Sequence, residues 1–317
     1  MQRRRLFRLI FTISVLVIII AGVILPMGIG MTFIRTLLLE YECGPAGPAP
    51  AALGMSAQEI RIPLANGIAR GWFMPGRLPG IILSPTPTGS RFGSLPDLAP
   101  LMRAGFGGVT WDGPRCLDKP VTIGLQESED IGMVLDYLAS NPDNLPILPG
   151  TKYALYGFSA AGAASTLAAA RRPDVAALLT AGGFERWDSV TGLSQGSTWF
   201  EWMIGFGGQL TYRVITGRDP RKLDPLAAIV NVAPRPILLM YGSLERSLDG
   251  ARKQLAAVRA KDPQAQAALY VVPGADHGGY LGIVGEAEYM AHLLPFFQCA
   301  LINEACDMWA AQVAASR

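Results

Sequence analysis

The sequence predicts an α/β protein with a mostly parallel sheet, helices on both faces of the sheet and a cap insertion, preceded by one transmembrane helix. Three observations lead to this prediction. Short apolar runs alternate with longer amphipathic runs from residue 58 onward, a long aliphatic run lies near the N-terminus, and a serine among small residues separates a strand pattern from a helix pattern. Such alternation is typical of a parallel sheet covered on both faces.

Four arginines near the N-terminus precede an uncharged run over residues 9–34. About 20 apolar residues cross the hydrocarbon layer as a helix, so this run is long enough to span it. A cleaved signal peptide is the competing interpretation, but its apolar region is usually about 7–15 residues long. We therefore expect residues 1–35 to stay on the protein as a cytoplasmic tip and a single-pass anchor. Because basic residues stay inside, the rest of the chain would be extracytoplasmic, which in a bacterium is the periplasm.

Residues 36–57 are rich in proline, glycine and alanine and are predicted to form a linker. Residues 58–317 then form the main domain. The formal net charge of the chain is +2, and beyond the N-terminus its basic residues are scattered, so nucleic acid is not an expected partner.

In the main domain, Asn66-Gly67 is a turn signal that predicts a leading hairpin, and strands and helices alternate after it. The expected strands are 59–64, 68–74, 79–84, 107–112, 151–155, 175–181, 236–241 and 268–272. The expected helices are 91–104, 127–140, 160–172, 250–261 and 286–301.

The turn between residues 155 and 160 carries Gly157 and Ser159, followed by Ala161 and Gly162. A serine on a tight strand-to-helix turn is a nucleophile elbow, which needs small residues two positions before and after the serine. Ala161 replaces the usual last glycine of Gly-x-Ser-x-Gly. The pattern alone is weak, since an ordinary strand-to-helix turn with a capping serine has the same residues, but it makes Ser159 the candidate nucleophile.

A nucleophilic serine needs a base, and the chain has only His277 and His292. His277 lies in a small-residue loop after the last expected strand, where such sheets place their chemistry. His292 lies inside an expected helix among apolar residues, which favours a structural role. The acid that orients the base should follow the preceding strand, and Glu245 stands there, three residues after a glycine; Asp249 is the rival.

The order Ser159, Glu245, His277 resembles that of the α/β-hydrolase superfamily, and over residues 58–301 the chain looks most similar to its esterase and serine-aminopeptidase-like branch. The resemblance implies a serine hydrolase, most simply one that cleaves a carboxylic ester through an acyl-enzyme without a cofactor. It also implies an oxyanion hole made by the backbone N–H groups of Thr86 and Ala160. The loop around Thr86 departs from the family pattern, because the prolines on either side of it have no N–H to donate.

The region of about 184–226 breaks the strand–helix alternation, and the resemblance implies a cap there. Its large side chains are candidates for an apolar substrate pocket, although they could instead only pack the cap onto the sheet. These candidates are Trp187, Trp199, Phe200, Trp202 and Met203.

Two alternative functions remain open: a peptidase or amidase of the same fold, and a catalytically silent hydrolase-like module that binds a partner. No metal-ligand spacing or cofactor motif is present. The expected partners are a small ester or acyl substrate and the membrane, and the oligomeric state stays open.

The four cysteines allow three pairings in an oxidising compartment. Cys299 could reach Cys306 only if the helix broke near Asn303, and Cys43 with Cys116 would then be left as the other pair.

Overall fold

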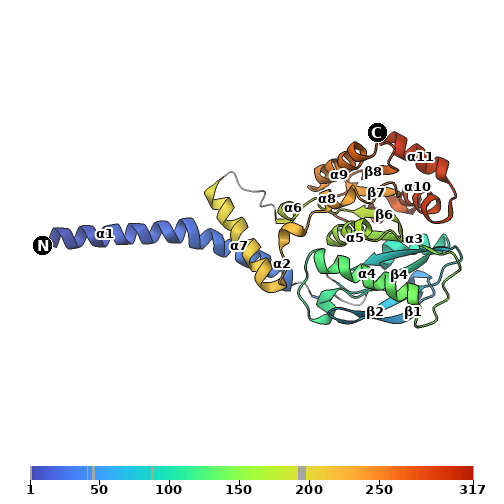
Figure 1. Ribbon diagram of the computed structural model, residues 1–317, viewed down its shortest axis with the longest axis horizontal. Helices are drawn as coiled ribbons and strands as arrows, with labels where there is room; N and C mark the ends of the chain where they lie inside the picture. The colour runs from blue at the N-terminus through green and yellow to red at the C-terminus, as the bar shows by residue number, and fades with distance from the viewer. Residues whose placement is uncertain (1, 41, 45–46, 87–88, 192–197, 317) are drawn as a thin grey trace. The chain divides into compact units, whose positions relative to one another are not determined.

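The computed structural model describes residues 2–40, 42–44, 47–86, 89–191 and 198–316. The chain folds as two compact units, whose elements are labelled in Figure 1. We call the first the helical unit; it consists of Met1–Glu40 and Trp187–Lys222. The second is the sheet unit, which consists of Tyr41–Arg186 and Leu223–Arg317.

The sheet unit contains one eight-stranded sheet in the order β1-β2-β4-β3-β5-β6-β7-β8. The pairs β1–β2 and β2–β4 are antiparallel, and all the others are parallel, so the predicted mixed sheet with a leading hairpin is confirmed. The strands are β1 (Gln58–Leu64), β2 (Gly67–Met74), β3 (Gly80–Pro85), β4 (Gly107–Trp111), β5 (Lys152–Phe158), β6 (Val175–Ala181), β7 (Ile237–Gly242) and β8 (Ala267–Val272).

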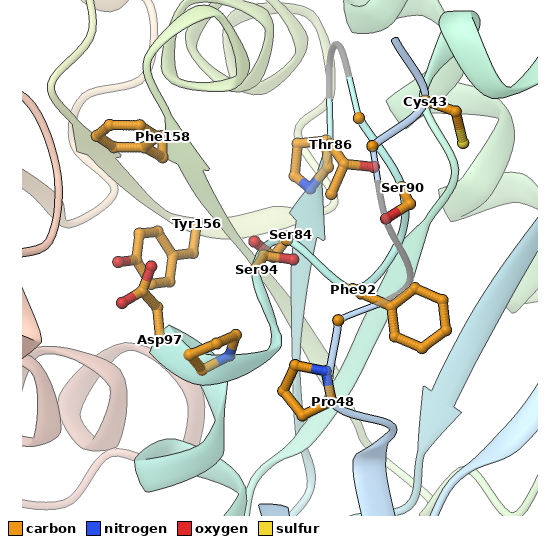
Figure 2. A pocket seen from close by; sticks show the side chains of 16 residues that line it. Cys43, Pro48, Ser84, Thr86, Ser90, Phe92, Ser94, Asp97, Tyr156 and Phe158 are labelled. Atoms are coloured by element: carbon orange, nitrogen blue, oxygen red, sulfur yellow. The ribbon is translucent and has the colours of Figure 1, made fainter.

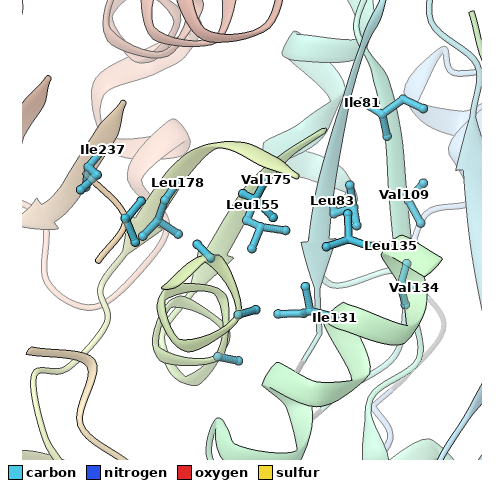
Figure 3. Close-up of a cluster of buried hydrophobic side chains, with 14 of the residues drawn as sticks. Ile81, Leu83, Val109, Ile131, Val134, Leu135, Leu155, Val175, Leu178 and Ile237 are labelled. Carbon is cyan, nitrogen blue, oxygen red and sulfur yellow. The ribbon is translucent and has the colours of Figure 1, made fainter. Parts of the chain in front are cut away.

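Helices cover both faces of this sheet, each face with its own apolar core. Residues of α4, α5, α8 and α9 fill one core, part of which Figure 3 shows, and residues of α3, α10 and α11 fill the other. Successive side chains of a strand point to opposite faces, so Leu155 enters the first core and Tyr156 the second. The helices are α3 (Leu95–Arg103), α4 (Leu125–Ser140), α5 (Ala160–Arg171), α8 (Pro225–Ile229), α9 (Leu248–Lys261), α10 (Tyr280–Ile302) and α11 (Cys306–Ala315), with 3₁₀ turns η2 (Pro50–Leu53) and η3 (Pro114–Leu117).

Two helices begin more than two residues away from their predicted starts. Helix α3 begins at Leu95 rather than at Arg91, because the Arg91 backbone N–H donates to Asp112 Oδ1 at 2.8 Å instead of entering a helix. Helix α10 begins at Tyr280 but is interrupted at Gly285, where φ is 78° and ψ is 162°. The predicted helix over 286–301 is therefore the part of α10 that follows this interruption.

The cysteines form two disulfides, Cys43–Cys116 and Cys299–Cys306. Asn303 follows the end of α10 with φ of 58°, so the helix breaks where a bond between the last two cysteines requires it. The first disulfide ties the segment that precedes β1 to η3, which lies more than sixty residues further along the chain.

The helical unit begins with a long helix made of α1 (Gln2–Ile19), the π-helical turn η1 (Ile20–Ile24) and α2 (Leu25–Leu39); α1 is the long blue helix in Figure 1. The helix thus continues through residues 36–39, which the sequence predicts as linker. By length and composition it is able to cross a membrane, a property that a signal sequence shares. The unit is completed by α6 (Trp187–Thr191), α7 (Trp199–Thr216) and η4 (Pro220–Lys222).

Candidate active site

Ser159 stands between β5 and α5 in a backbone conformation that non-glycine residues rarely adopt, with φ of 55° and ψ of −123°. Its own N–H donates to the carbonyl of Ala181 at the end of β6, and its carbonyl accepts the N–H of Gly162. These bonds hold the strained turn, which costs of order 1–3 kcal/mol and persists only where the surroundings determine it. The serine side chain is thereby presented at the carboxyl end of the parallel strands.

The small residues around Ser159 are required by close backbone contacts. A Cβ atom on Gly157 would lie 2.2 Å from the carbonyl oxygen of Ala161, and one on Gly162 would lie 2.3 Å from Thr180 Oγ1. Ala161 itself is fully buried, so the methyl group that departs from the glycine pattern is accommodated. The position where this turn needs glycine after the serine is therefore residue 162.

His277 lies in the loop between β8 and α10 and reaches Ser159 across the sheet edge. Its Nε2 is 2.9 Å from Ser159 Oγ, and its Nδ1 is 2.6 Å from Glu245 Oε1. The ring also contacts the Phe158 ring, with centroids 4.8 Å apart. The candidate nucleophile, base and acid are thus joined by two hydrogen bonds, an arrangement that is able to activate a serine.

Glu245 is held by more donors than His277 alone. Its carboxylate accepts hydrogen bonds from the Tyr280 hydroxyl at 2.6 Å, the Ser247 hydroxyl at 2.8 Å and the Gly242 backbone N–H at 3.0 Å. Burial would raise the pKa of Glu245, but the hydrogen bonds from His277, Tyr280, Ser247 and Gly242 outweigh it and hold the pKa below its ordinary value. The carboxylate is therefore ionised at neutral pH and can stabilise a positively charged imidazole.

The two candidate acids differ in exposure and in the side chains that they contact. The Glu245 side chain is 3% exposed and contacts His277, whereas the Asp249 side chain is 78% exposed and pairs with Arg252 at 2.8 Å. His292, the other histidine, stacks on Tyr270 and bonds to Glu288 on the outside of α10. Neither Asp249 nor His292 belongs to the hydrogen-bonded group around Ser159.

The two candidate oxyanion donors come from segments that are far apart in sequence. Ala160 is the first residue of α5, so its N–H is one of those that the helix leaves without an internal acceptor. Thr86 directly follows β3 and is buried. Pro87 and Thr88, the next residues of the predicted oxyanion loop, lie outside the described residues. The assignment of Thr86 stays a prediction.

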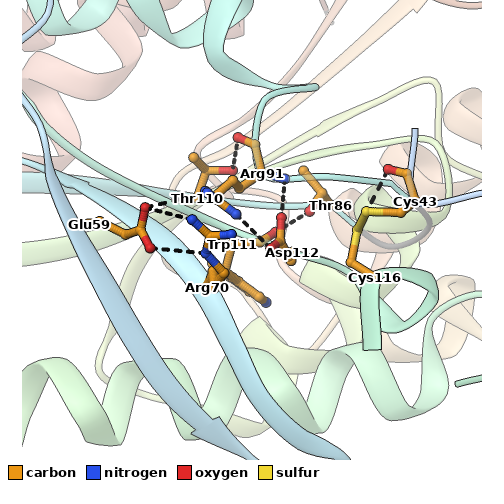
Figure 4. Close-up of polar contacts among 9 residues, drawn as sticks. All are labelled: Cys43, Glu59, Arg70, Thr86, Arg91, Thr110, Trp111, Asp112 and Cys116. Atoms are coloured by element: carbon orange, nitrogen blue, oxygen red, sulfur yellow. Dashed lines mark hydrogen bonds and ion pairs between the residues drawn. A yellow bond between two sulfur atoms is a disulfide. The ribbon is translucent and has the colours of Figure 1, made fainter. Parts of the chain in front are cut away.

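Polar contacts hold Thr86 and Arg91 against the end of β4, as Figure 4 shows. The Thr86 hydroxyl donates to the carbonyl of Trp111, and Arg91 pairs with Asp112 at 2.7 Å in a buried ion pair. The Arg91 guanidinium also lies over the Trp72 ring, 5.0 Å from its centroid. These contacts position Thr86 and Arg91 beside the end of β4.

A cavity of about 480 Å³ opens beside this group within the sheet unit. Phe92, Phe158 and Tyr156 contribute aromatic surface to it, Thr86 and the linker residues around Pro48 contribute further walls, and Figure 2 shows their arrangement. Phe158 lines the cavity and its ring also contacts His277, so Phe158 lies between the cavity and the hydrogen-bonded group.

Asp97 is the acidic side chain that lines this cavity, and sequence reasoning missed it. Among the described residues it makes no hydrogen bond or ion pair, and Figure 2 shows its carboxylate next to the Tyr156 hydroxyl. Burial raises the pKa of Asp97 to about 6. Tyr280, a donor to Glu245, was missed as well. In the structure they lie in the first turns of α3 and α10, but the sequence predicts Asp97 within a helix and Tyr280 outside one, and nothing there marks either residue as functional.

The five predicted pocket residues all lie in the helical unit. Trp187 and Met203 are buried in that unit, the former against Tyr212. Trp199, Phe200 and Trp202 are 61%, 43% and 48% exposed. Within the described parts of the chain, no group of three or more His, Cys, Asp or Glu side chains is placed to hold a metal ion.

The fold is similar to that of several hydrolases of known structure. The Pyrococcus furiosus esterase Pf2001 matches with a TM-score of 0.59 and 16% identity, covering 80% of this chain and 95% of that one. The alpha/beta hydrolase GrgF from Penicillium sp. sh18 matches with a TM-score of 0.53 and 17% identity, covering 82% of this chain and 100% of that one. A puromycin-hydrolyzing peptidase of Mycobacterium tuberculosis matches with a TM-score of 0.59 and 17% identity, covering 82% of this chain and 42% of that one.

No protein-family model matches the sequence, and no curated protein matches it. The structural similarity at these low identities shows the fold, and it confirms the predicted fold class. The neighbours include an esterase and a peptidase, so the fold by itself does not distinguish between these two activities.

Proposed function

We propose that this chain, which has the α/β-hydrolase fold, is a membrane-anchored serine hydrolase that acts on carboxylic esters with an apolar acyl group. The observation that carries the proposal is the hydrogen-bonded series Ser159–His277–Glu245. It connects a serine on a strained elbow to a base, and the base to a carboxylate that is kept ionised by four donors.

The proposed reaction follows from this geometry. Ser159 Oγ attacks the acyl carbon of the ester while His277 Nε2 takes its proton, and the negative charge that develops on the carbonyl oxygen is stabilised by the N–H groups of Ala160 and Thr86. His277 then returns the proton to the leaving alcohol, and an acyl-enzyme forms. Water, activated by the same histidine, releases the acid. Glu245 keeps Nδ1 of His277 protonated and stabilises the imidazolium in both steps.

The apolar acyl group is proposed from the cavity beside the triad. Its aromatic walls, Phe92, Phe158 and Tyr156, suit an apolar chain, and its volume lies in the range typical of small-molecule sites. An acyl pocket formed by Trp187, Trp199, Phe200, Trp202 and Met203 stays a prediction.

The anchoring is proposed from the N-terminal helix, which is able to cross a membrane by length and composition. The arginines before it would keep the N-terminus in the cytoplasm, and the sheet unit would then be extracytoplasmic. Disulfides are common in such compartments, and the two disulfides agree with this placement.

Labelling with a fluorophosphonate probe tests the nucleophile directly, because the probe reacts with activated serines. We expect one adduct, located on Ser159 by peptide mass spectrometry, and no labelling of the Ser159→Ala variant. The control variant is Ser140→Ala, which changes an exposed serine at the end of α4 and should label like the wild type. A folded wild-type protein that stays unlabelled would instead support the catalytically silent binding module.

A peptidase or aminoacyl amidase is the second candidate, and Asp97 is the observation that favours it. A substrate with a free amino group could place its ammonium beside this carboxylate, which has no ion-pair partner among the described residues and whose burial is otherwise costly. One structural neighbour is a peptidase.

Comparing alanine p-nitroanilide with propionyl p-nitroanilide, which lacks the amino group, tests this candidate. If Asp97 recognises the amine, Asp97→Asn should lower kcat/KM for the first substrate by roughly tenfold or more and leave the second unchanged. Asp249→Asn is the matched control, since it removes an exposed carboxylate from the same unit. Equal effects of Asp97→Asn on both substrates would exclude amine recognition by Asp97.

A further inference from the structure

Helix α7 packs on the N-terminal helix through direct backbone contact within the helical unit. A Cβ atom on Gly30 would lie 1.9 Å from the carbonyl oxygen of Ile204, and one on Gly207 would lie 2.4 Å from the carbonyl oxygen of Met27. Small residues allow two helices to approach this closely, as they do between membrane helices. Helix α7 is therefore packed tightly along the N-terminal helix.

The side of α7 that does not face α2 carries a stripe of exposed apolar side chains. They recur every three or four residues and so share one helix face; they are Trp199, Trp202, Phe206, Leu210 and Val214. The first three rings form a continuous stack, with centroid distances of 5.2 Å from Trp199 to Trp202 and 5.6 Å from Trp202 to Phe206. We call this the aromatic stripe. Soluble proteins rarely expose so much contiguous apolar surface without a partner.

One hydrogen bond defines where the aromatic stripe begins along the N-terminal helix. The Trp199 indole N–H donates to the carbonyl oxygen of Gly22 at 2.9 Å, and Gly22 lies within the π-helical turn η1. This turn belongs to the uncharged run over residues 9–34. Helix α7 therefore starts beside a residue that is itself part of the apolar anchor, and not beside the polar end of the helix.

The length of the N-terminal helix also places the start of α7 within the bilayer. The span Arg3–Leu39 has 37 residues, which corresponds to about 55 Å, whereas the hydrocarbon layer is about 30 Å thick. Counted from Arg8, the last arginine of the N-terminal cluster, Gly22 lies roughly 21 Å along the helix, which is inside that thickness. The start of α7 is thus at the depth of the outer part of the bilayer.

We propose that α7 is a second membrane-binding element, and that its aromatic stripe is immersed in the outer leaflet, from the hydrocarbon layer into the interfacial region, of the same bilayer that the anchor crosses. Tryptophan prefers this region because its ring is apolar and its N–H is polar. The helix has one acid and one base, Glu201 and Arg213, so little charge would have to be desolvated. The partner is lipid, and anchoring by the N-terminal helix, as proposed above, is the premise.

Quenching of tryptophan fluorescence by brominated lipid tests the proposal on the full-length protein in phosphatidylcholine vesicles. The chain has six tryptophans, none of them in residues 1–40, and Trp199 and Trp202 are far more exposed than the buried Trp111, Trp187 and Trp309. We expect vesicles that contain dibromo-phosphatidylcholine to quench wild-type emission. The double variant Trp199→Phe/Trp202→Phe keeps the aromatic stripe but should lose that quenching.

Trp72→Phe is the matched control, because Trp72 packs on Phe92 inside the sheet unit; this variant should be quenched like the wild type. Quenching that is the same in the double variant and in the wild type would overturn the proposal. So would a wild-type protein that floats with the vesicles but is not quenched, which would point to a second copy or another protein on the stripe. A protein that does not float would contradict the anchoring itself, while leaving the esterase proposal to its own labelling test.

Discussion

The two units of this protein use aromatic side chains in opposite ways. In the sheet unit Phe106, Phe296 and Trp309 are buried in the core between the sheet and α10, whereas in the helical unit Trp199 and Trp202 are stacked and exposed. A large ring is buried in the protein core where it would otherwise be exposed to water. The comparison shows that a concentration of aromatic residues does not by itself indicate a substrate pocket.

Glycine, in contrast, serves the same purpose in both units. Gly157 and Gly242 let the elbow and the acid turn approach neighbouring backbone, and Gly30 and Gly207 let two helices do so. In the sheet unit these contacts position a polar site, and in the helical unit they bring together two apolar helices. The predictions below test this division, beginning with the largest expected effect.

Substitution of the two histidines should give the largest difference in kcat between two variants. His277→Ala removes the base that contacts Ser159 and should lower kcat for short p-nitrophenyl esters by about 10⁴–10⁶-fold. His292→Ala removes a ring that stacks on Tyr270, so it should reduce the thermal midpoint with little change in kcat. Steady-state kinetics on folded variants measure both; similar kcat values for the two variants would remove His277 from the mechanism.

Substitution of the two candidate acids should give the next largest difference in kcat. Glu245→Gln leaves the shape of the site intact but removes the charge that stabilises the imidazolium, so kcat should fall roughly 10⁴-fold with a modest change in KM. Asp249→Asn should be nearly silent, because Asp249 is exposed and bonded only to Arg252 among the described residues. If Asp249→Asn proves the more damaging change, the assignment of the acid is wrong.

A series of esters from acetate to octanoate decides where the acyl chain binds. Each methylene held in an apolar pocket should contribute up to ~0.8 kcal/mol, or nearly fourfold in kcat/KM, until the pocket is full. We expect Phe92→Leu, in the cavity of the sheet unit, to alter this dependence and Trp202→Leu, in the helical unit, to leave it unchanged. The reverse result would assign the pocket to the aromatic residues of the predicted cap, and a flat series would argue against any apolar pocket.

Two neighbouring glycines test the packing of the helical unit. Gly30→Ala places a Cβ atom 1.9 Å from the Ile204 carbonyl and should destabilise the helix pair by about 1–3 kcal/mol. Gly28→Ala meets nothing within 4 Å and should be neutral or slightly stabilising. The midpoint of thermal unfolding in detergent micelles measures both, and equal midpoints would show that α7 does not pack on α2 through Gly30.

The smallest expected effect is a pH dependence that Asp97 imposes on stability. Because burial raises the pKa of Asp97 to about 6 in the folded chain, while the unfolded value is about 4, the folded state binds more protons between these values. Stability should therefore fall as pH rises through this window. Asp97→Asn should remove that fall and be more stable than the wild type by roughly 1–3 kcal/mol at pH 7.

Denaturant unfolding at pH 3.5 and at pH 7 measures this effect. At the lower pH Asp97 is largely protonated in both states, so wild type and variant should be nearly alike there. A constant difference between them at both pH values would mean that Asp97 is solvated or paired in the folded protein.

The sequence by itself determined the order and type of the strands and of α3, α4, α5, α9 and α10 in the sheet unit, because apolar periodicity and turn residues are local properties. The helices α8 and α11 were not predicted. The strand over 175–181 was predicted with its observed bounds, and the serine, the loop histidine and the carboxylate were proposed as candidates because few residues could fill these roles. The bounds of α3 were not predictable, since they depend on the contact of Arg91 with Asp112, which is distant in sequence.

The tertiary structure decided what depends on approaches between distant segments. It brought His277 between Ser159 and Glu245 rather than Asp249, added Tyr280 as a donor to Glu245, and placed Asp97 in a cavity, without a hydrogen bond or ion pair among the described residues. It also placed α7 beside the N-terminal helix and left Trp199 and Trp202 exposed. Periodicity shows that a helix has an apolar face but not what covers it, because protein core, substrate and lipid are all apolar surroundings.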